Sequence, residues 1–286
     1  MVPPAAFALE AVLRRDRWIV LAGLVMLTAL AWAYLLGVAG AMDGMTAGAT
    51  TGEPPGGGTD AGGPSMEGMS MAAAMAPGIR AWSAREFAFT FTMWAVMMVA
   101  MMVPAASPLV LLHLRTHQQQ WSARAAKRAT SAFVLGYLLA WTGFSAAATL
   151  LQWGLERLAL LSPMMVGTSD LFGGLVLATA GAYQLTPIKD ACLNHCRSPV
   201  GFIMHHWRPG ARGALRMGLH HGLYCIGCCW FLMALLFVGG VMNLAWIAAL
   251  TVLVLLEKLL PGGRLLARIT GAALLAAGGL LLLRAL

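Results

Sequence analysis

Long apolar runs, separated by short polar or charged segments, recur along the whole chain of 286 residues. Each run holds about 20 residues, the length that an α-helix needs to cross the hydrocarbon core of a membrane. Spanning β-strands would instead give alternating runs of about ten residues. We therefore predict an all-α, polytopic membrane helical bundle with about seven transmembrane helices. The predicted spans are roughly 18–38, 87–112, 129–153, 171–186, 217–241, 244–260 and 265–283.

The composition supports this fold class, since 59% of the residues are hydrophobic and only 10% are charged. A soluble domain has about a quarter of its residues charged. The net charge of +8 is explained by topology, because most of the 19 Lys and Arg residues lie in the N-terminal tail and after the second, fourth and sixth spans. The positive-inside rule places that side, with the N-terminus, in the cytoplasm. We predict the lipid bilayer as a partner and no nucleic acid.

Three regions follow from this pattern. Residues 1–40 hold the N-terminal tail and the first transmembrane helix, whose apolar run is longer than the core of about 7–15 residues in a signal peptide. Residues 41–85 form a Met- and Gly-rich external loop of low complexity, which we expect to be disordered. Residues 86–286 form a six-helix membrane domain that carries the Met, Cys and His motifs.

The external loop is unusual in its methionines, which come two or three residues apart. Thioether is a soft, neutral ligand that favours Cu(I) over harder cations. It needs no deprotonation, and it is not lost to disulfide formation outside the cell. The alternative is a polar linker with chance methionines. We interpret the cluster as a site of copper capture formed by Met42, Met45, Met66, Met69 and Met71.

The second span contains a second group of methionines. Met93, Met97 and Met101 lie four residues apart and share one helical face, with Met98 on the neighbouring face. Methionine often fills membrane cores, so packing is the alternative interpretation. The depth of this row in the membrane overlaps with that of the cysteines in the fifth span. We predict that the two rows share one metal site.

The fifth span begins with a row of metal-binding residue types. His221, Cys225 and either Cys228 or Cys229 lie three or four residues apart, so they share one helical face. Thiolate and imidazole are ligands of Cu(I) and zinc. The alternative is that these cysteines are small packing residues. A catalytic thiol is less favoured, because an apolar setting disfavours the reactive thiolate.

The remaining two cysteines, Cys192 and Cys196, are predicted in the cytoplasmic loop that follows the fourth span. Their spacing fits one helical turn, so the pair can bind Cu(I) or zinc or remain a reduced dithiol. Every cysteine of the chain is predicted inside the membrane or on its cytoplasmic side, where thiols stay reduced.

Two further groups of polar residues lie near the cytoplasmic ends of spans. Glu257 and Lys258 are expected to form an interfacial pair, with Lys258 extending to the membrane surface; alternatively, Glu257 orients a histidine or accepts a proton. His113 and His117 end the second span and are expected to be solvated.

Four sequence elements resemble a bacterial family described as predicted metal-binding integral membrane proteins. They span about residues 90–263. The first two are Met93-Trp94 through Met101-Met102-Val103-Pro104, and Thr186-Pro187-x-Lys189-x-x-Cys192-x3-Cys196-x2-Pro199. The other two are Gly218-x3-Gly222-x2-Cys225-x-Gly227-Cys228-Cys229-Trp230 and Glu257-Lys258-x2-Pro261.

The resemblance implies a multi-pass protein of the bacterial inner membrane that binds metal. It also implies a role with copper, because some family members are regarded as copper-chaperone-like partners of copper oxidases. Together with the soft ligands, it predicts that the protein binds Cu(I) and hands it to a copper enzyme, with zinc as the less favoured metal. Two alternatives remain open. One is a copper transporter, and the other is a membrane metal- or thiol-dependent oxidoreductase, although the sequence carries no recognisable quinone or haem motif.

Overall fold

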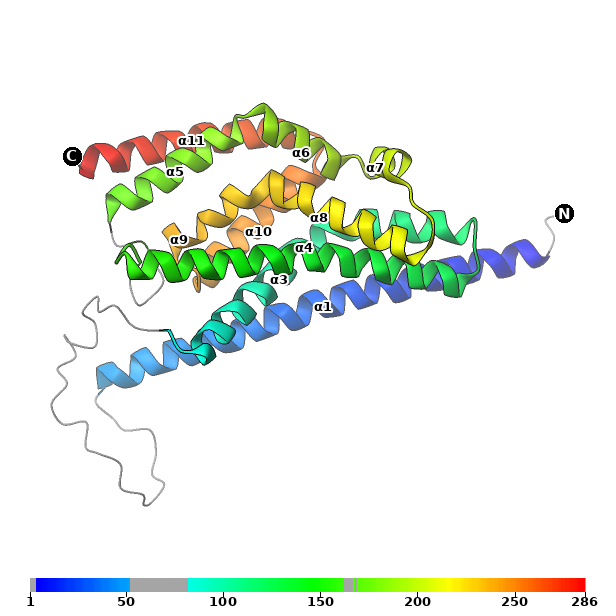
Figure 1. Cartoon of the computed structure of the whole chain (residues 1–286), viewed down its shortest axis with the longest axis horizontal. Helices are drawn as coiled ribbons and strands as arrows, with labels where there is room; N and C mark the ends of the chain where they lie inside the picture. Colours follow the sequence, from blue (N-terminus) through cyan, green and yellow to red (C-terminus); the bar gives the residue numbers. More distant parts are fainter. Residues whose placement is uncertain (1–3, 52–81, 162–166, 168, 286) are drawn as a thin grey trace, which may run out of the picture.

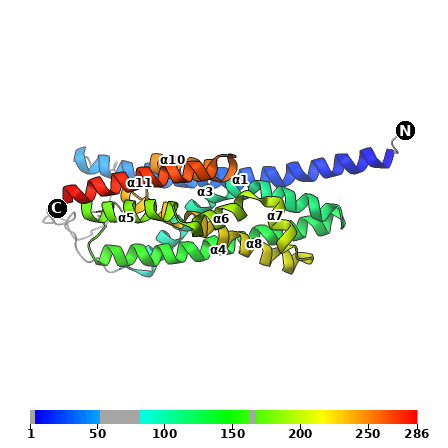
Figure 2. The ribbon, with the colours of Figure 1, turned by 90° about the horizontal axis from the view of Figure 1, so that it is seen from above.

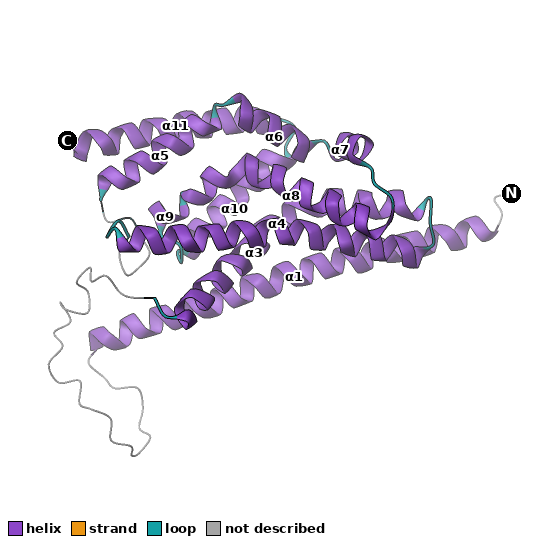
Figure 3. Ribbon diagram, viewed as in Figure 1, coloured by secondary structure: helices purple, strands orange, loops and turns teal. Residues whose placement is uncertain are grey.

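The computed structural model describes residues 4–51, 82–161, 167 and 169–285, with side chains described for 16–40 and from 82 onward. The regular elements in these ranges are α-helices (Figure 3). They are α1 (Pro4–Thr51), α3 (Ala84–Gln118), α4 (Ala123–Arg157), α5 (Asp170–Gln184), α6 (Pro187–Arg197), α7 (Pro199–His206), α8 (Gly210–Ala234), α9 (Leu236–Gly239), α10 (Leu244–Leu259) and α11 (Gly263–Ala285).

The predicted all-α bundle of membrane-type helices is confirmed, but seven spans is too high a count. Within the described residues, five helices are long and apolar enough to cross a membrane, and the bent pair of α5 and α6 can add a sixth. The sixth predicted span forms α10, which has only 16 residues. At about 1.5 Å per residue it is about 24 Å long, which is shorter than a hydrocarbon core of about 30 Å.

Helix α1 also extends further than expected. It continues to Thr51, so the first part of the predicted external loop, with Met42 and Met45, is helical rather than disordered. The sequence explains the extension, since the first prolines after the apolar run are Pro54 and Pro55. Met66, Met69 and Met71 lie outside the described residues.

The helices run roughly along the long axis of the molecule and pack in pairs (Figures 1 and 2). Helix α1 lies along α3, α4 lies along α8, and α5 lies along α11. Helix α10 contacts α3, α6 and α11, so it connects two of these pairs. This arrangement differs from the predicted pairing of the second and fifth spans, because α8 packs mainly against α4 rather than α3.

Small residues explain why α4 and α8 approach so closely. A side chain at Gly218 of α8 would collide with the carbonyl oxygen of Phe133, and one at Gly136 of α4 would collide with the backbone of Leu215. Membrane helices use small residues in this way, because close backbone contact replaces the hydrophobic driving force that water supplies to soluble proteins. The contact fixes the rotation of α8 and thereby the direction in which its cysteines point.

A sharp bend between α5 and α6 determines where the last two cysteines lie. The two helices meet at an angle of 65°. Pro187 cannot continue α5 but suits the first turn of α6. The Thr186 hydroxyl accepts a hydrogen bond from the backbone N–H of Lys189 and caps the new helix. The bend turns α6 back against α8.

Candidate metal centre

The thiols of α8 point into the centre of the bundle. Cys225, Cys228 and Cys229 are each at most 2% exposed. The Sγ atoms of Cys228 and Cys229 lie 3.1 and 2.9 Å from the carbonyl oxygen of Cys225, one helical turn earlier. All the cysteines in the described residues are free thiols. The α8 row is therefore a set of reduced, desolvated sulfur donors.

Helix α6 adds a fourth thiol to this row. The Sγ atom of Cys196 lies 3.8 Å from that of Cys228. A metal–sulfur bond of about 2.3 Å allows two sulfurs on one ion to lie up to about 4.6 Å apart, so this pair is close enough to share an ion. Cys192 packs nearby, because a side chain at Gly227 of α8 would lie 2.9 Å from its sulfur. The α6 and α8 cysteines, predicted as two separate sites, thus lie side by side.

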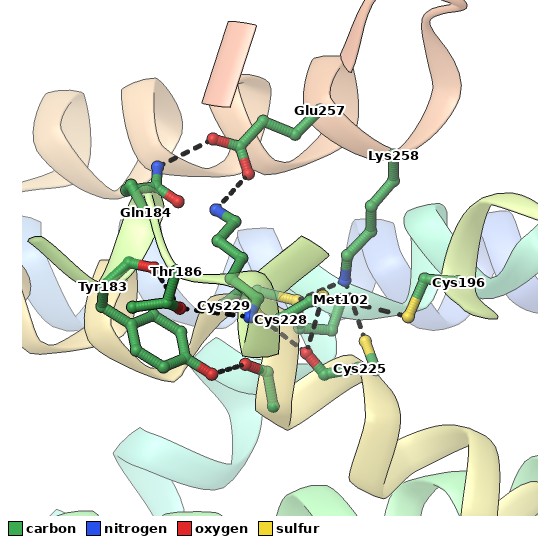
Figure 4. A network of polar contacts seen from close by, with 12 residues as sticks. Met102, Tyr183, Gln184, Thr186, Cys196, Cys225, Cys228, Cys229, Glu257 and Lys258 are labelled. Atoms are coloured by element: carbon green, nitrogen blue, oxygen red, sulfur yellow. Dashed lines mark hydrogen bonds and ion pairs between the residues drawn. The ribbon is translucent and has the colours of Figure 1, made fainter. Parts of the chain in front are cut away.

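A lysine from α10 completes the cluster. The Lys258 ammonium nitrogen lies 2.9 Å from Cys225 Sγ and 4.0 Å from the sulfur of Met102 on α3 (Figure 4). Tyr137 of α4 donates a hydrogen bond to the carbonyl oxygen of Met102 at 3.0 Å, and its hydroxyl lies 3.2 Å from Cys225 Sγ. We call Cys196, Cys225, Cys228, Met102 and Lys258 the thiol–lysine cluster.

A buried ion pair holds the adjacent position on α10. Glu257 accepts a hydrogen bond from Lys189 of α6 at 2.7 Å and another from the amide of Gln184 of α5 at 2.9 Å. Lys189 and Glu257 are at most 2% exposed. Glu257 and Lys258 therefore do not form the expected interfacial pair. Both side chains point into the bundle, because α10 is covered by α3, α6 and α11.

The predicted metal ligands of α3 are four methionines that lie in the buried core of the bundle. Met93, Met97, Met98 and Met101 are fully buried in the same hydrophobic core as the α8 cysteines. Within the described residues, the α3 methionine whose sulfur contacts Lys258 is instead Met102, which lies beside this row. Methionine packs well against sulfur and aromatic groups, so this burial fits the packing interpretation, and a role for the row as metal ligands stays a prediction.

His221 lies one turn before Cys225 and packs among aromatic rings. Its ring centroid is 5.7 Å from that of Tyr137 and 5.2 Å from that of Phe202. It is 3% exposed, and its Nδ1 atom has no hydrogen-bond partner. A buried nitrogen without a partner is rare and calls for an explanation. A role for His221 as a metal ligand stays a prediction.

His113 and His117, which were expected to be solvated, are buried instead. His113 and His117 are at most 1% exposed. Their ring centroids lie 4.5 Å apart with the planes tilted by 45°, and the His117 ring also lies 4.5 Å from that of Trp207, which follows α7. The connection between α7 and α8 folds over the end of α3 and covers both rings.

The chemistry of the cluster fits a soft metal ion better than a hard one. No three His, Cys, Asp or Glu side chains form a metal-binding group in the part of the chain that the structure describes. The sulfur donors of the cluster are the adjacent thiols of Cys196 and Cys228 together with the Cys225 thiol and the Met102 thioether, which both contact Lys258, and sulfur donors favour Cu(I). They are held together by α3, α6 and α8, with a cation from α10 against the sulfur of Cys225.

The comparisons with known proteins agree with this chemistry. Residues 91–281 match the PpoB2 family, described as copper chaperone. The chain belongs to the PpoB2 copper chaperone family. The predicted resemblance to a copper-chaperone-like family is thereby confirmed. The match includes every residue of the thiol–lysine cluster and leaves α1 outside. No curated protein and no solved structure matches the chain.

Sequence reasoning missed three residues of the candidate site, namely Lys258, Tyr137 and Met102. The signal for Lys258 was present, since an ionisable residue within a membrane helix is a functional candidate by default. Tyr137 and Met102 carried no such signal, because tyrosine and methionine are ordinary core residues. Only the packing of α4 and α10 reveals their contacts with Cys225 and Lys258.

Proposed function

We propose that the protein is a membrane copper chaperone that binds Cu(I) at the thiol–lysine cluster and hands it to a copper enzyme. One observation carries this proposal: the sulfurs of Cys196 and Cys228, from two different helices, lie 3.8 Å apart inside an apolar bundle. The family match supports copper as the cargo. The membrane location rests on the five helices that are long and apolar enough to span a bilayer.

Lys258 has a clear electrostatic role in this proposal. Cu(I) binds thiols in their deprotonated form, so a complex with two thiolates carries a net negative charge. A buried negative charge needs a counter-charge close by. The Lys258 ammonium, 2.9 Å from Cys225 Sγ, supplies it. The lysine therefore stabilises the loaded cluster without binding the metal.

The exposure of the thiols suggests how the ion leaves the cluster. Cys192 and Cys196 of α6 are partly exposed, whereas the three α8 cysteines are buried. Cys196 is thus the ligand that a partner protein reaches first. We propose that Cu(I) moves by ligand exchange from the buried α8 thiols to Cys196 and then to the recipient. The external methionines, including Met42 and Met45, would concentrate copper beforehand.

A Cu(I) competition titration tests the binding step. The purified full chain is titrated with Cu(I) under reducing conditions against a chromogenic chelator. We expect the Cys196→Ser/Cys228→Ser variant to bind Cu(I) at least about tenfold more weakly, because a serine hydroxyl is a hard oxygen donor and a poor ligand for Cu(I) compared with a thiolate. The matched control is Met93→Leu/Met97→Leu, which removes two buried sulfurs outside the cluster. An equal loss in both variants would contradict the proposal.

The handover step needs a separate experiment. A copper oxidase is expressed in bacterial cells with and without this protein, and its copper content is measured after purification. We expect the oxidase to lose most of its copper when the protein is absent or carries Cys196→Ser. Full copper loading without the protein would refute delivery, while the titration above would still report on binding.

A dithiol oxidoreductase is the second candidate, because the same Cys196–Cys228 contact suits disulfide exchange. The two functions differ in their need for copper. An oxidoreductase would cycle between dithiol and disulfide in copper-free cells, and trapping of free thiols would detect the oxidised form. A chaperone keeps both thiols reduced there.

A further inference from the structure

Basic side chains gather at the end of the molecule where the turn between α3 and α4 meets the start of α8 (Figure 1). A cavity of about 760 Å³ opens there. Its lining includes Arg124 and Arg128 of α4 and Arg212 of α8, together with His117 and Trp121. None of the cysteines or methionines of the thiol–lysine cluster lines it. The cavity is therefore separate from the candidate metal centre.

The charge of the cavity is uncompensated. Within the described residues, none of the three arginines forms an ion pair with a carboxylate. The acidic residue next to this region, Asp16, is already engaged, since it pairs with Lys127 at 2.7 Å and accepts a hydrogen bond from Gln118 at 3.1 Å. Three guanidinium groups around one cavity are the side chains best suited to bind phosphate.

Two helix N-termini add to this positive field. Ser122, the N-cap of α4, and Gly210, the first residue of α8, both line the cavity. Ser122 caps its own helix, but the N-cap of α8 is Pro209, whose side chain makes no capping hydrogen bond. The first amides of α8 thus keep free N–H groups. Such groups, with the helix dipole behind them, bind anions.

His117 provides an independent sign of a missing partner. It lines the cavity, it is only 1% exposed, and its Nε2 atom has no hydrogen-bond partner. Trp121 and Trp207 hold the ring in place, with centroids at 4.7 and 4.5 Å. A buried polar atom at a cavity wall is satisfied when a ligand occupies the cavity.

We propose that this cavity is a binding site for a phosphate-bearing anion, held by Arg124, Arg128, Arg212 and the free amides of α8. The phosphodiester headgroup of an acidic phospholipid and a free phosphate compound share this chemistry. Trp121, which is 39% exposed, lies beside the arginines, as in the aromatic belts of membrane interfaces. The positive-inside rule places this end on the cytoplasmic side, where basic pockets between helices bind anionic headgroups.

The test measures binding to the purified full chain in a neutral detergent. One arm adds phosphatidylglycerol, with phosphatidylcholine as the uncharged reference, and counts bound lipid by native mass spectrometry. The other arm adds inorganic pyrophosphate and measures binding by calorimetry. Each arm uses the wild type and the Arg124→Gln/Arg128→Gln/Arg212→Gln variant. The matched control is Arg17→Gln/Arg115→Gln/Arg216→Gln, which removes the same charge from exposed arginines outside the cavity.

We expect the cavity variant to bind at least about tenfold more weakly, because each lost arginine removes a charge-assisted contact. The control should bind like the wild type. Binding in the lipid arm alone identifies a headgroup site, and binding in the pyrophosphate arm alone identifies a site for a soluble phosphate. No binding in either arm overturns the proposal, and so does an equal loss in the control, which would mean that only net charge matters. Unchanged Cu(I) affinity in the cavity variant checks that it is folded.

Discussion

Helix α10 places two consecutive charged residues in two regions that lie side by side but differ in composition. In the carboxylate region, Glu257 is paired with Lys189 and also hydrogen-bonded to Gln184, so both charges are matched within the protein. In the thiol region, Lys258 contacts the sulfurs of Cys225 and Met102 (Figure 4). Within the described residues, Lys258 has no carboxylate partner.

This difference separates a structural lysine from a functional one. A buried ion pair such as Lys189–Glu257 is complete, so it needs no ligand and fixes α6 against α10. The charge of a buried ammonium next to thiols is balanced only when the sulfurs carry negative charge, as they do when they bind a metal ion. Lys189 and Lys258 are both buried lysines, and they differ in their partners, which are a carboxylate for Lys189 and sulfur atoms for Lys258.

The largest expected effect is on stability, from Lys189→Met. It leaves Glu257 buried without its counter-charge, which typically costs about 3–5 kcal/mol. Unfolding in mixed detergent micelles measures the change in free energy. Replacing both partners, as in Lys189→Met/Glu257→Leu, should recover most of the loss. A cost below about 1 kcal/mol for Lys189→Met alone would show that the pair is not important for stability.

Lys258→Met should affect Cu(I) binding more than it affects stability. It removes a buried charge that has no described carboxylate partner, so the free energy of unfolding should fall by less than about 1 kcal/mol or should rise. Cu(I) affinity should drop by about tenfold, because the loaded cluster loses its counter-charge. Lys258→Arg should retain most of the affinity. Equal destabilisation by Lys189→Met and Lys258→Met would remove the distinction between the two regions.

The methionines of α3 give a third, smaller effect. Met102→Leu should weaken Cu(I) binding by about threefold or more, because its thioether is the one in described contact with Lys258. Met97→Leu should leave the affinity within about threefold and the stability within about 1.5 kcal/mol, since leucine conserves the buried volume. The same competition titration measures both variants. A larger loss in Met97→Leu would restore the predicted methionine row as part of the metal site.

His221→Phe should have the smallest effect. The ring packs against Tyr137 and Phe202, and phenylalanine keeps its shape. We expect Cu(I) affinity within about threefold of the wild type, because no hydrogen bond is lost at Nδ1. A loss of more than about tenfold would instead identify that nitrogen as a metal ligand.

The sequence predicted much of the fold because membrane helices are defined by length and apolarity. Helices α3, α4 and α11 contain their predicted spans, while the predicted span 217–241 begins in α8 and runs past its end at Ala234 through α9. The count failed at α10, where the apolar run is long enough for a core helix but too short for a span. The helical end of α1 was missed because a run rich in Gly and Met resembles a linker.

The site was predicted in part, since the α8 cysteine row was identified from its spacing. Its partner from α6 was placed in a loop, because spacing gives the face of one helix but not the 65° bend that turns Cys196 toward Cys228. The position of Lys258 depends on which face α10 presents to α3 and α6. Such contacts between distant segments follow from packing and not from local pattern.

X-ray absorption at the copper edge tests the cluster most directly. The Cu(I)-loaded wild type should show sulfur neighbours only, and Cys196→Ser/Cys228→Ser should lose those neighbours together with most of the bound copper. Cys192→Ser, which alters the other α6 thiol, serves as the control and should leave the spectrum unchanged. A wild-type spectrum dominated by nitrogen or oxygen, or an unchanged sulfur shell in the double variant, would contradict copper binding at the thiol–lysine cluster.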